Sequence, residues 1–107
     1  MTSPNGAALS GRNLRYAILV CLHERSRPTT VEELDEAIDA WGLSVDATDP
    51  DRVGKRISDA LRWEVRRGRA VRVRWNLYEA GVIPRTTLRR AQEAIALVMQ
   101  QATVVHR

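Results

Sequence analysis

The residues best suited to chemistry in this 107-residue chain are the basic ones between Arg52 and Arg74. This stretch holds nine arginine and lysine residues but only two acids, Asp59 and Glu64, so its formal charge is +7. Like charges one helical turn apart repel each other, which weakens a domain standing alone. We therefore expect a polyanionic partner, with nucleic acid as the first candidate. The nine basic residues are Arg52, Lys55, Arg56, Arg62, Arg66, Arg67, Arg69, Arg72 and Arg74.

Charge is distributed unevenly along the chain. Residues 1–51 carry four arginines against nine acids, whereas residues 52–107 carry thirteen basic residues against four acids. Of the seventeen basic residues sixteen are arginine, which suits paired hydrogen bonds to phosphate and to guanine edges. Codon usage in a GC-rich genome would produce the same bias. The folded molecule should have an acidic side and a basic side.

Residue types for catalysis or metal binding are not grouped in the sequence. Cys21 is the one cysteine and lies in an apolar run, so we expect a buried, reduced thiol in a cytoplasmic protein. His23 would lie on another face of the same helix, and His106 is distant. We expect no enzyme, metal, cofactor or small-molecule ligand. The longest apolar run, residues 17–22, is too short for a bilayer, and residues 1–11 do not resemble a secretory signal.

The elements that must position the basic residues belong to one domain with additions at both ends. Residues 1–12 are rich in Ser, Pro, Gly and Asn without periodicity, which predicts a flexible arm. Residues 13–81 should form the domain. Its first helix starts at Asn13 with apolar residues at helical spacing and ends near Ser26, because Pro28 cannot continue a helix.

A second helix is predicted from a capping box. Thr30 is followed three residues later by Glu33, and apolar residues then recur at helical spacing until Gly42 closes the segment. Its outer side is acidic and should be solvated. Phosphate would be repelled by this face.

The third helix, residues 50–67, carries the basic cluster on one face. Asp49 as N-cap and Pro50 as first residue begin it, and Gly68 is a natural C-terminal residue. At 100° per residue the helix divides into two sides. Val53, Ile57, Ala60, Leu61 and Val65 form the core side, and Arg52, Lys55, Asp59, Arg62 and Arg66 form the basic side.

A β-hairpin is predicted over residues 69–80. Valines at 71 and 73 alternate with arginines at 72 and 74, and the tip falls near Trp75 and Asn76. Residues 82–107 then form a C-terminal helix with an apolar heptad stripe. That helix would either complete its own domain or pair with a second copy, and we expect a homodimer. The stripe consists of Leu88, Ala91, Ile95, Val98, Ala102 and Val105.

Three helices followed by a hairpin, with the basic face on the third helix, resemble the winged helix-turn-helix family over residues 13–81. The run ISDALRWEVRRGR from Ile57 to Arg69, followed by Val-Arg-Val at 71–73 and by Tyr78, is similar to small Arg-rich bacterial winged-helix proteins of unassigned function. The fold class expected is therefore mainly α with a small β-hairpin, a winged helix with an added C-terminal helix.

In that family the third helix enters the major groove and the hairpin, or wing, lies along the neighbouring backbone or minor groove. The resemblance implies a double-stranded DNA-binding protein, cytoplasmic or nucleoid-associated, and a regulator of transcription. The alternative is a winged-helix protein-protein interaction module that does not bind DNA. The DNA contacts implied are Arg52, Lys55, Arg56 and Ser58 to bases, Arg62, Arg66, Arg69 and Arg72 to phosphates, and Arg72, Arg74 and Trp75 on the wing.

Four single residues have alternative roles or alternative partners. Asp59 would accept a hydrogen bond from cytosine or hold neighbouring arginines in place. Glu64 points toward the apolar side, where we expect an ion pair with Arg15 or Arg67. The indole of Trp63 would pack on its own domain or offer a stacking platform. An exposed Trp75 would contact another molecule or subunit.

Overall fold

The computed structural model describes residues 8–105, and the side chains of residues 8–101. Within this part of the chain four α-helices and a three-stranded sheet make up most of the structure, so the expectation of a mainly α protein with a small hairpin is confirmed. The elements are β1 Ala8–Leu9, α1 Gly11–Arg25, β2 Thr29–Thr30, α2 Val31–Ala40, β3 Ser44–Val45, a 3₁₀ turn Pro50–Arg52, α3 Val53–Arg66, β4 Ala70–Arg74, β5 Leu77–Ala80 and α4 Arg85–Val105.

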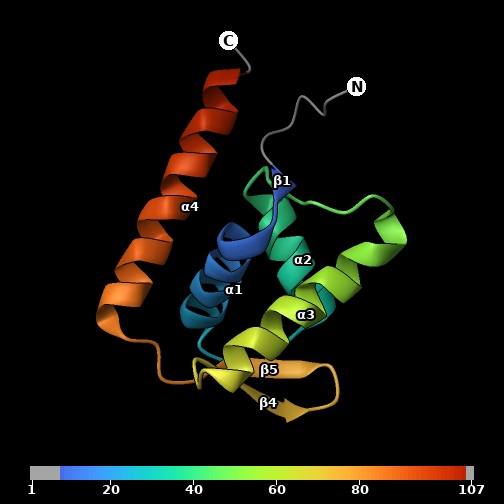
Figure 1. Cartoon of the computed structure of the whole chain (residues 1–107), viewed down its shortest axis with the longest axis vertical. Coiled ribbons are helices and arrows are strands. Elements are labelled where there is room, and N and C mark those ends of the chain that lie inside the picture. The colour runs from blue at the N-terminus through green and yellow to red at the C-terminus, as the bar shows by residue number, and fades with distance from the viewer. Residues whose placement is uncertain (1–7, 106–107) are drawn as a thin grey trace.

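Helix α1 lies at the centre of the molecule, with α2, α3, α4 and β5 packed around it (Figure 1). Six consecutive residues, 17–22, are buried, so the central part of this helix is covered on every side rather than on one stripe. Among them is Cys21, as expected, and burial raises the pKa of its thiol to about 12. The thiol is therefore protonated at neutral pH.

Helix α2 starts with the predicted capping box. The hydroxyl of Thr30 accepts a hydrogen bond from the backbone N–H of Glu33 at 3.1 Å, and the Glu33 carboxylate accepts one from the N–H of Thr30 at 2.9 Å. The second bond is the main cause of a lowered pKa at Glu33. These two bonds satisfy backbone donors that the helix itself leaves without partners.

Helix α3 ends as its glycine predicts. Gly68 has φ +75°, and its N–H donates to the carbonyl of Val65 at 3.0 Å, while the N–H of Arg69 donates to the carbonyl of Glu64 at 3.0 Å. This pair of bonds is the Schellman arrangement, which favours glycine because of its left-handed backbone. It turns the chain directly into β4.

The hairpin is part of a sheet in the order β2-β5-β4. Strand β5 pairs with β4 on one side and on the other with the two residues of β2, where Thr29 lies opposite Tyr78. The pairing of β4 shifts between Arg72 and Arg74, so Val73 forms a bulge near the tip. Strand β2 ties the hairpin to the segment between α1 and α2.

The prediction of a flexible arm over residues 1–12 is wrong for residues 8–12. Strand β1 pairs in parallel with β3, with Leu9 opposite Val45, and α1 already begins at Gly11. The side chain of Leu9 is buried in the core. A two-residue strand is too short to produce a periodic pattern, which is why composition suggested an arm. Residues 1–7 lie outside the described residues.

The assignment of the α4 stripe to a dimer interface is also wrong at its centre. Ala91, Ile95 and Val98 are buried within the chain itself, where α4 packs along α1 (Figure 1). Of the other predicted interface residues Leu88 is partly buried, and the side chains of Ala102 and Val105 lie outside the described part. The three central residues instead fit the alternative prediction, in which α4 completes its own domain.

No helix within residues 8–105 is both long and apolar enough to cross a membrane.

Candidate nucleic-acid interface

Helix α3 separates its side chains as the periodicity predicts. Ile57 and Leu61 are fully buried against α1 and α2, while the opposite face is open to water. Of the predicted core side, Val65 is 36% exposed and belongs to the border between the two faces. The exposed basic residues on this helix and its preceding turn are Arg52, Lys55, Arg56, Arg62 and Arg66, and Ser58 beside them is partly exposed.

Asp59 lies within this basic face and contacts two of its cations. Its carboxylate is 3.4 Å from Nζ of Lys55 and 3.8 Å from Nη1 of Arg62. The second of its two predicted roles, holding neighbouring basic side chains, is therefore present in the free protein. Exposed pairs of this kind contribute only about 0.2–1 kcal/mol, so a phosphate can replace the carboxylate at little cost.

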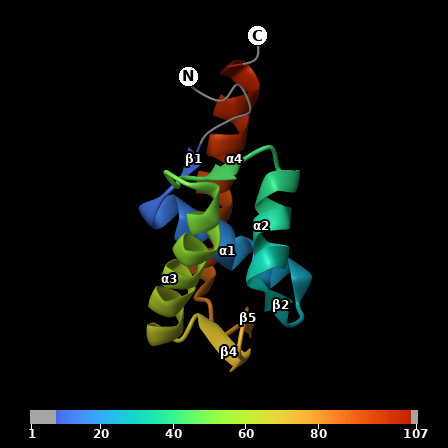
Figure 2. The same cartoon turned by 90° about the vertical axis from the view of Figure 1, so that its right-hand side faces the viewer.

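The β4–β5 hairpin lies next to the C-terminal end of α3 (Figure 2). Arg72 and Arg74 on β4 are exposed, and Trp75 at the turn is 80% exposed, as predicted. Strand β4 forms the free edge of the sheet. The basic side chains of α3 and of β4 thus lie on neighbouring elements.

The tip of the hairpin is anchored to the start of α2. Asn76 has φ +59°, a conformation that asparagine tolerates better than most residues. Its amide donates a hydrogen bond to the Glu32 carboxylate at 2.8 Å and accepts one from the N–H of Val31 at 3.4 Å. The bond from Asn76 is the main cause of a lowered pKa at Glu32. The turn that carries Trp75 is therefore held against the start of α2 through the next residue, Asn76.

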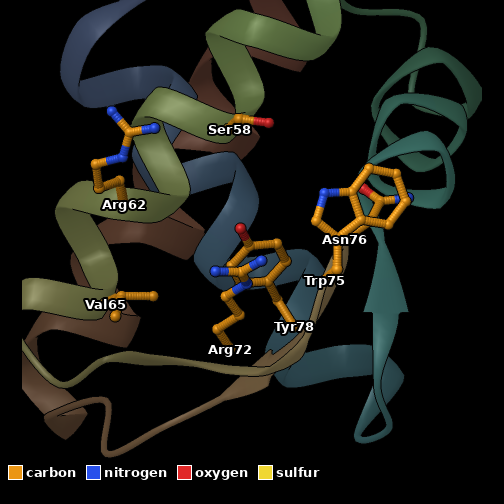
Figure 3. A pocket seen from close by; sticks show the side chains of 7 residues that line it. All are labelled: Ser58, Arg62, Val65, Arg72, Trp75, Asn76 and Tyr78. Carbon is orange, nitrogen blue, oxygen red and sulfur yellow. The ribbon is translucent and has the colours of Figure 1, made fainter.

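An open groove of about 410 Å³ lies between α3 and the hairpin (Figure 3). The sequence suggested no such hollow, because its two walls come from segments that meet only through folding. Val65, Asn76 and Tyr78 were not among the predicted site residues, and no local signal singles them out. The groove is lined by Ser58, Arg62 and Val65 from α3 and by Arg72, Trp75, Asn76 and Tyr78 from the hairpin.

One predicted phosphate contact, Arg69, has an acidic partner within the domain. Nε of Arg69 lies 2.6 Å from the carboxylate of Glu64, which is fully buried, so this guanidinium is already paired within the domain. The other Glu64 oxygen is 3.6 Å from Nε of Arg15, which confirms the first of the two expected partners. Arg67, the other expected partner, instead lies over the ring of Trp63.

The ring of Trp63 contacts two arginine side chains of its own domain. The guanidinium carbons of Arg15 and Arg67 lie 4.8 Å and 4.6 Å from the centre of its ring, within the range of cation–π attraction. The side chain is 38% exposed. Of its two predicted roles, packing on its own domain is the one that the structure shows.

Within residues 8–105 no three histidine, cysteine or acidic side chains are grouped as a metal site would require. Comparison of the chain with protein-family models, with curated proteins and with solved structures found no match.

Proposed function

We propose that this chain binds double-stranded DNA as a winged-helix protein, acting as a transcriptional regulator or a nucleoid-type factor. Helix α3 enters the major groove, and the β4–β5 hairpin serves as the wing. The order of three helices and a hairpin agrees with this arrangement, and the pairing of β2 with β5 holds the hairpin against the helices.

The observation that carries the proposal is the basic surface that continues from α3 onto β4. Its side chains are exposed, whereas the opposite face of α3 is buried, so the charge cannot be explained by packing. The 14 residues of α3 span about 21 Å, and a major groove about 12 Å wide admits such a helix.

The roles of the individual residues follow from their positions on this surface. Arg62 and Arg66 on α3 and Arg72 on β4 contact phosphates, whereas Arg69 does not, because it is paired with Glu64. The first turns of α3 face the base edges, with Arg52, Lys55, Arg56 and Ser58. Arg74 and Trp75 belong to the wing.

Fluorescence anisotropy with a labelled duplex of random sequence, measured at several salt concentrations, tests the proposal. We expect affinity to fall steeply with salt, because phosphate contacts release counterions. Replacing both Arg62 and Arg66 by alanine should weaken binding to all sequences alike and reduce the salt slope by about two. A matched control removes two exposed arginines of α4, Arg89 and Arg90, and should change little. A salt-insensitive complex, or an equal loss in the control, would count against DNA binding.

The interaction-module alternative has one observation in its favour. Trp75 is 80% exposed, and Val71 and Val73 on the same hairpin are 44% and 45% exposed. Apolar contacts are little screened by salt, so a protein complex made here would persist at high salt and be lost in Trp75→Ala. Binding of random duplex that disappears at high salt instead favours DNA.

A further inference from the structure

We propose that the groove between α3 and the hairpin holds one unpaired nucleotide of DNA, with its base stacked on Trp75 and its phosphate between Arg62 and Arg72. The protein would then prefer DNA that contains unpaired bases over a fully paired duplex. This inference rests on the proposed DNA binding and names the form of DNA that the site selects.

The size of the groove suits a single nucleotide. Its volume of about 410 Å³ lies near the lower end of the roughly 300–1,000 Å³ found for small-ligand clefts. A duplex is far too wide to enter such a hollow. The two walls come from α3 and from the hairpin, so DNA lying along α3 passes its opening (Figure 3).

Trp75 provides a stacking surface at one end of the groove, beside Asn76 (Figure 3). Its indole is 80% exposed, although an indole is one of the largest apolar groups in a protein. The hydrogen bonds of Asn76 to Glu32 and Val31 hold the turn, so the ring is offered from a fixed position. Nucleobases of every type stack on such rings, and a paired base inside a duplex cannot reach one.

The charges of the groove orient the nucleotide. Arg62 lines the α3 wall and Arg72 the hairpin wall, and Ser58 and Tyr78 add hydroxyl groups that can donate to a phosphate. In the free protein the Arg62 guanidinium is turned toward the exposed carboxylate of Asp59, at 3.8 Å, a weak pair that a phosphate can replace. At the Trp75 end, the negatively charged Glu32 carboxylate accepts a hydrogen bond from the Asn76 amide at 2.8 Å, and this bond lowers the pKa of Glu32. Phosphate is therefore repelled from the tip, and the uncharged base is placed there.

The test compares two labelled DNAs of equal length, an intact duplex and the same duplex with three mismatched central pairs, at one salt concentration. We expect the mismatched DNA to bind more tightly by about 5- to 150-fold, the range that corresponds to stacking of one base on an aromatic ring. Trp75→Ala should bring the ratio of the two affinities close to one, and Trp75→Phe should largely keep it. Val82→Ala, at an apolar residue 81% exposed, is the matched control and should leave both affinities unchanged.

A second readout uses the fluorescence of the protein itself. Stacking should quench tryptophan emission when the mismatched DNA binds, and Trp75→Phe should lose this quenching while it still binds. Equal affinity for the two DNAs, or a ratio that survives Trp75→Ala, would overturn this inference and leave the proposed function intact. Failure of both DNAs to bind would overturn both proposals together.

Discussion

Glu64 is a carboxylate without exposure to water, held between arginines from two other elements. Arg15 belongs to α1 and Arg69 leads into β4, so this one side chain of α3 joins three parts of the domain. Among residues 8–101, whose side chains the structure describes, one of its oxygens has no hydrogen-bond partner and only the looser contact with Arg15. A buried ion pair adds little net stability, but loss of one member leaves charge unbalanced in a poorly solvated place. Its role here is to fix how α3 meets the hairpin.

Glu64→Ala should therefore lower the free energy of unfolding by about 3 kcal/mol, the lower end for breaking a buried pair. The lower end applies because Arg15 and Arg69 are 27% and 20% exposed and regain some hydration. Urea denaturation followed by circular dichroism measures the change. Glu93→Ala, at an exposed acid of α4, is the control and should stay within about 0.5 kcal/mol of the parent. Equal stability of the two variants would contradict a structural role for the buried carboxylate.

At the scale of elements, the hairpin is held by a close crossing of two loops. The N–H of Gly81 donates to the carbonyl of Arg69 at 2.8 Å, and the N–H of Val82 donates to that of Gly68 at 2.9 Å. A Cβ at Gly81 would lie 2.4 Å from the Gly68 carbonyl oxygen. The approach of backbone to backbone therefore requires glycine at position 81, although the sequence around it shows only the end of a strand.

Gly81→Ala should destabilise the domain by about 1–3 kcal/mol, because one of the two backbone segments must move. Gly54 offers a matched comparison inside α3, where a new Cβ meets nothing nearer than Val31 at 3.9 Å. Gly54→Ala should stabilise by about 0.5–1 kcal/mol, since alanine favours a helix over glycine. Thermal melting of both variants checks the opposite signs. A Gly81→Ala protein as stable as the parent would show that the crossing is not tight.

At the scale of the whole molecule, α4 covers one side of the central helix α1 and so completes the core. The centre of the apolar stripe that suggested pairing with a second copy is buried within the chain, where α4 lies along α1, and Ile95 there is 3% exposed. The groove beside α3 lies on other elements, α3 and the hairpin, so neither the proposed DNA surface nor the nucleotide site uses the stripe. The packing of α4 on α1 and the candidate interface therefore involve different residues.

Ile95→Ala should lower the free energy of unfolding by about 2–5 kcal/mol, because it opens a cavity between α1 and α4. Sedimentation equilibrium of the folded variant should give the same mass as the parent. Leu97→Ala, two residues away and 54% exposed, is the control and should leave stability nearly unchanged. A variant that loses an associated state while its subunit keeps full stability would indicate that Ile95 serves an interface between copies.

Most helix boundaries and exposed faces could be predicted from sequence, because the signals that determine them are local. Thr30 and Glu33 bond to each other's backbone within one helical turn. Gly68 ends α3 because glycine adopts a positive φ easily. The two faces of α3 follow from 3.6 residues per turn. The exposure of Trp75 follows from its place in a tight turn between two strands. These features depend on residues a few positions apart.

Only the tertiary structure decided which distant residues meet. Strand β1 pairs with β3, Arg69 forms an ion pair with the buried Glu64, and the centre of the α4 stripe is buried where α4 lies along α1. The groove beside Trp75 exists because the hairpin turns back beside α3. An apolar stripe or an arginine specifies that a partner is needed, but burial and charge pairing are satisfied by whichever partner the folded chain brings nearest.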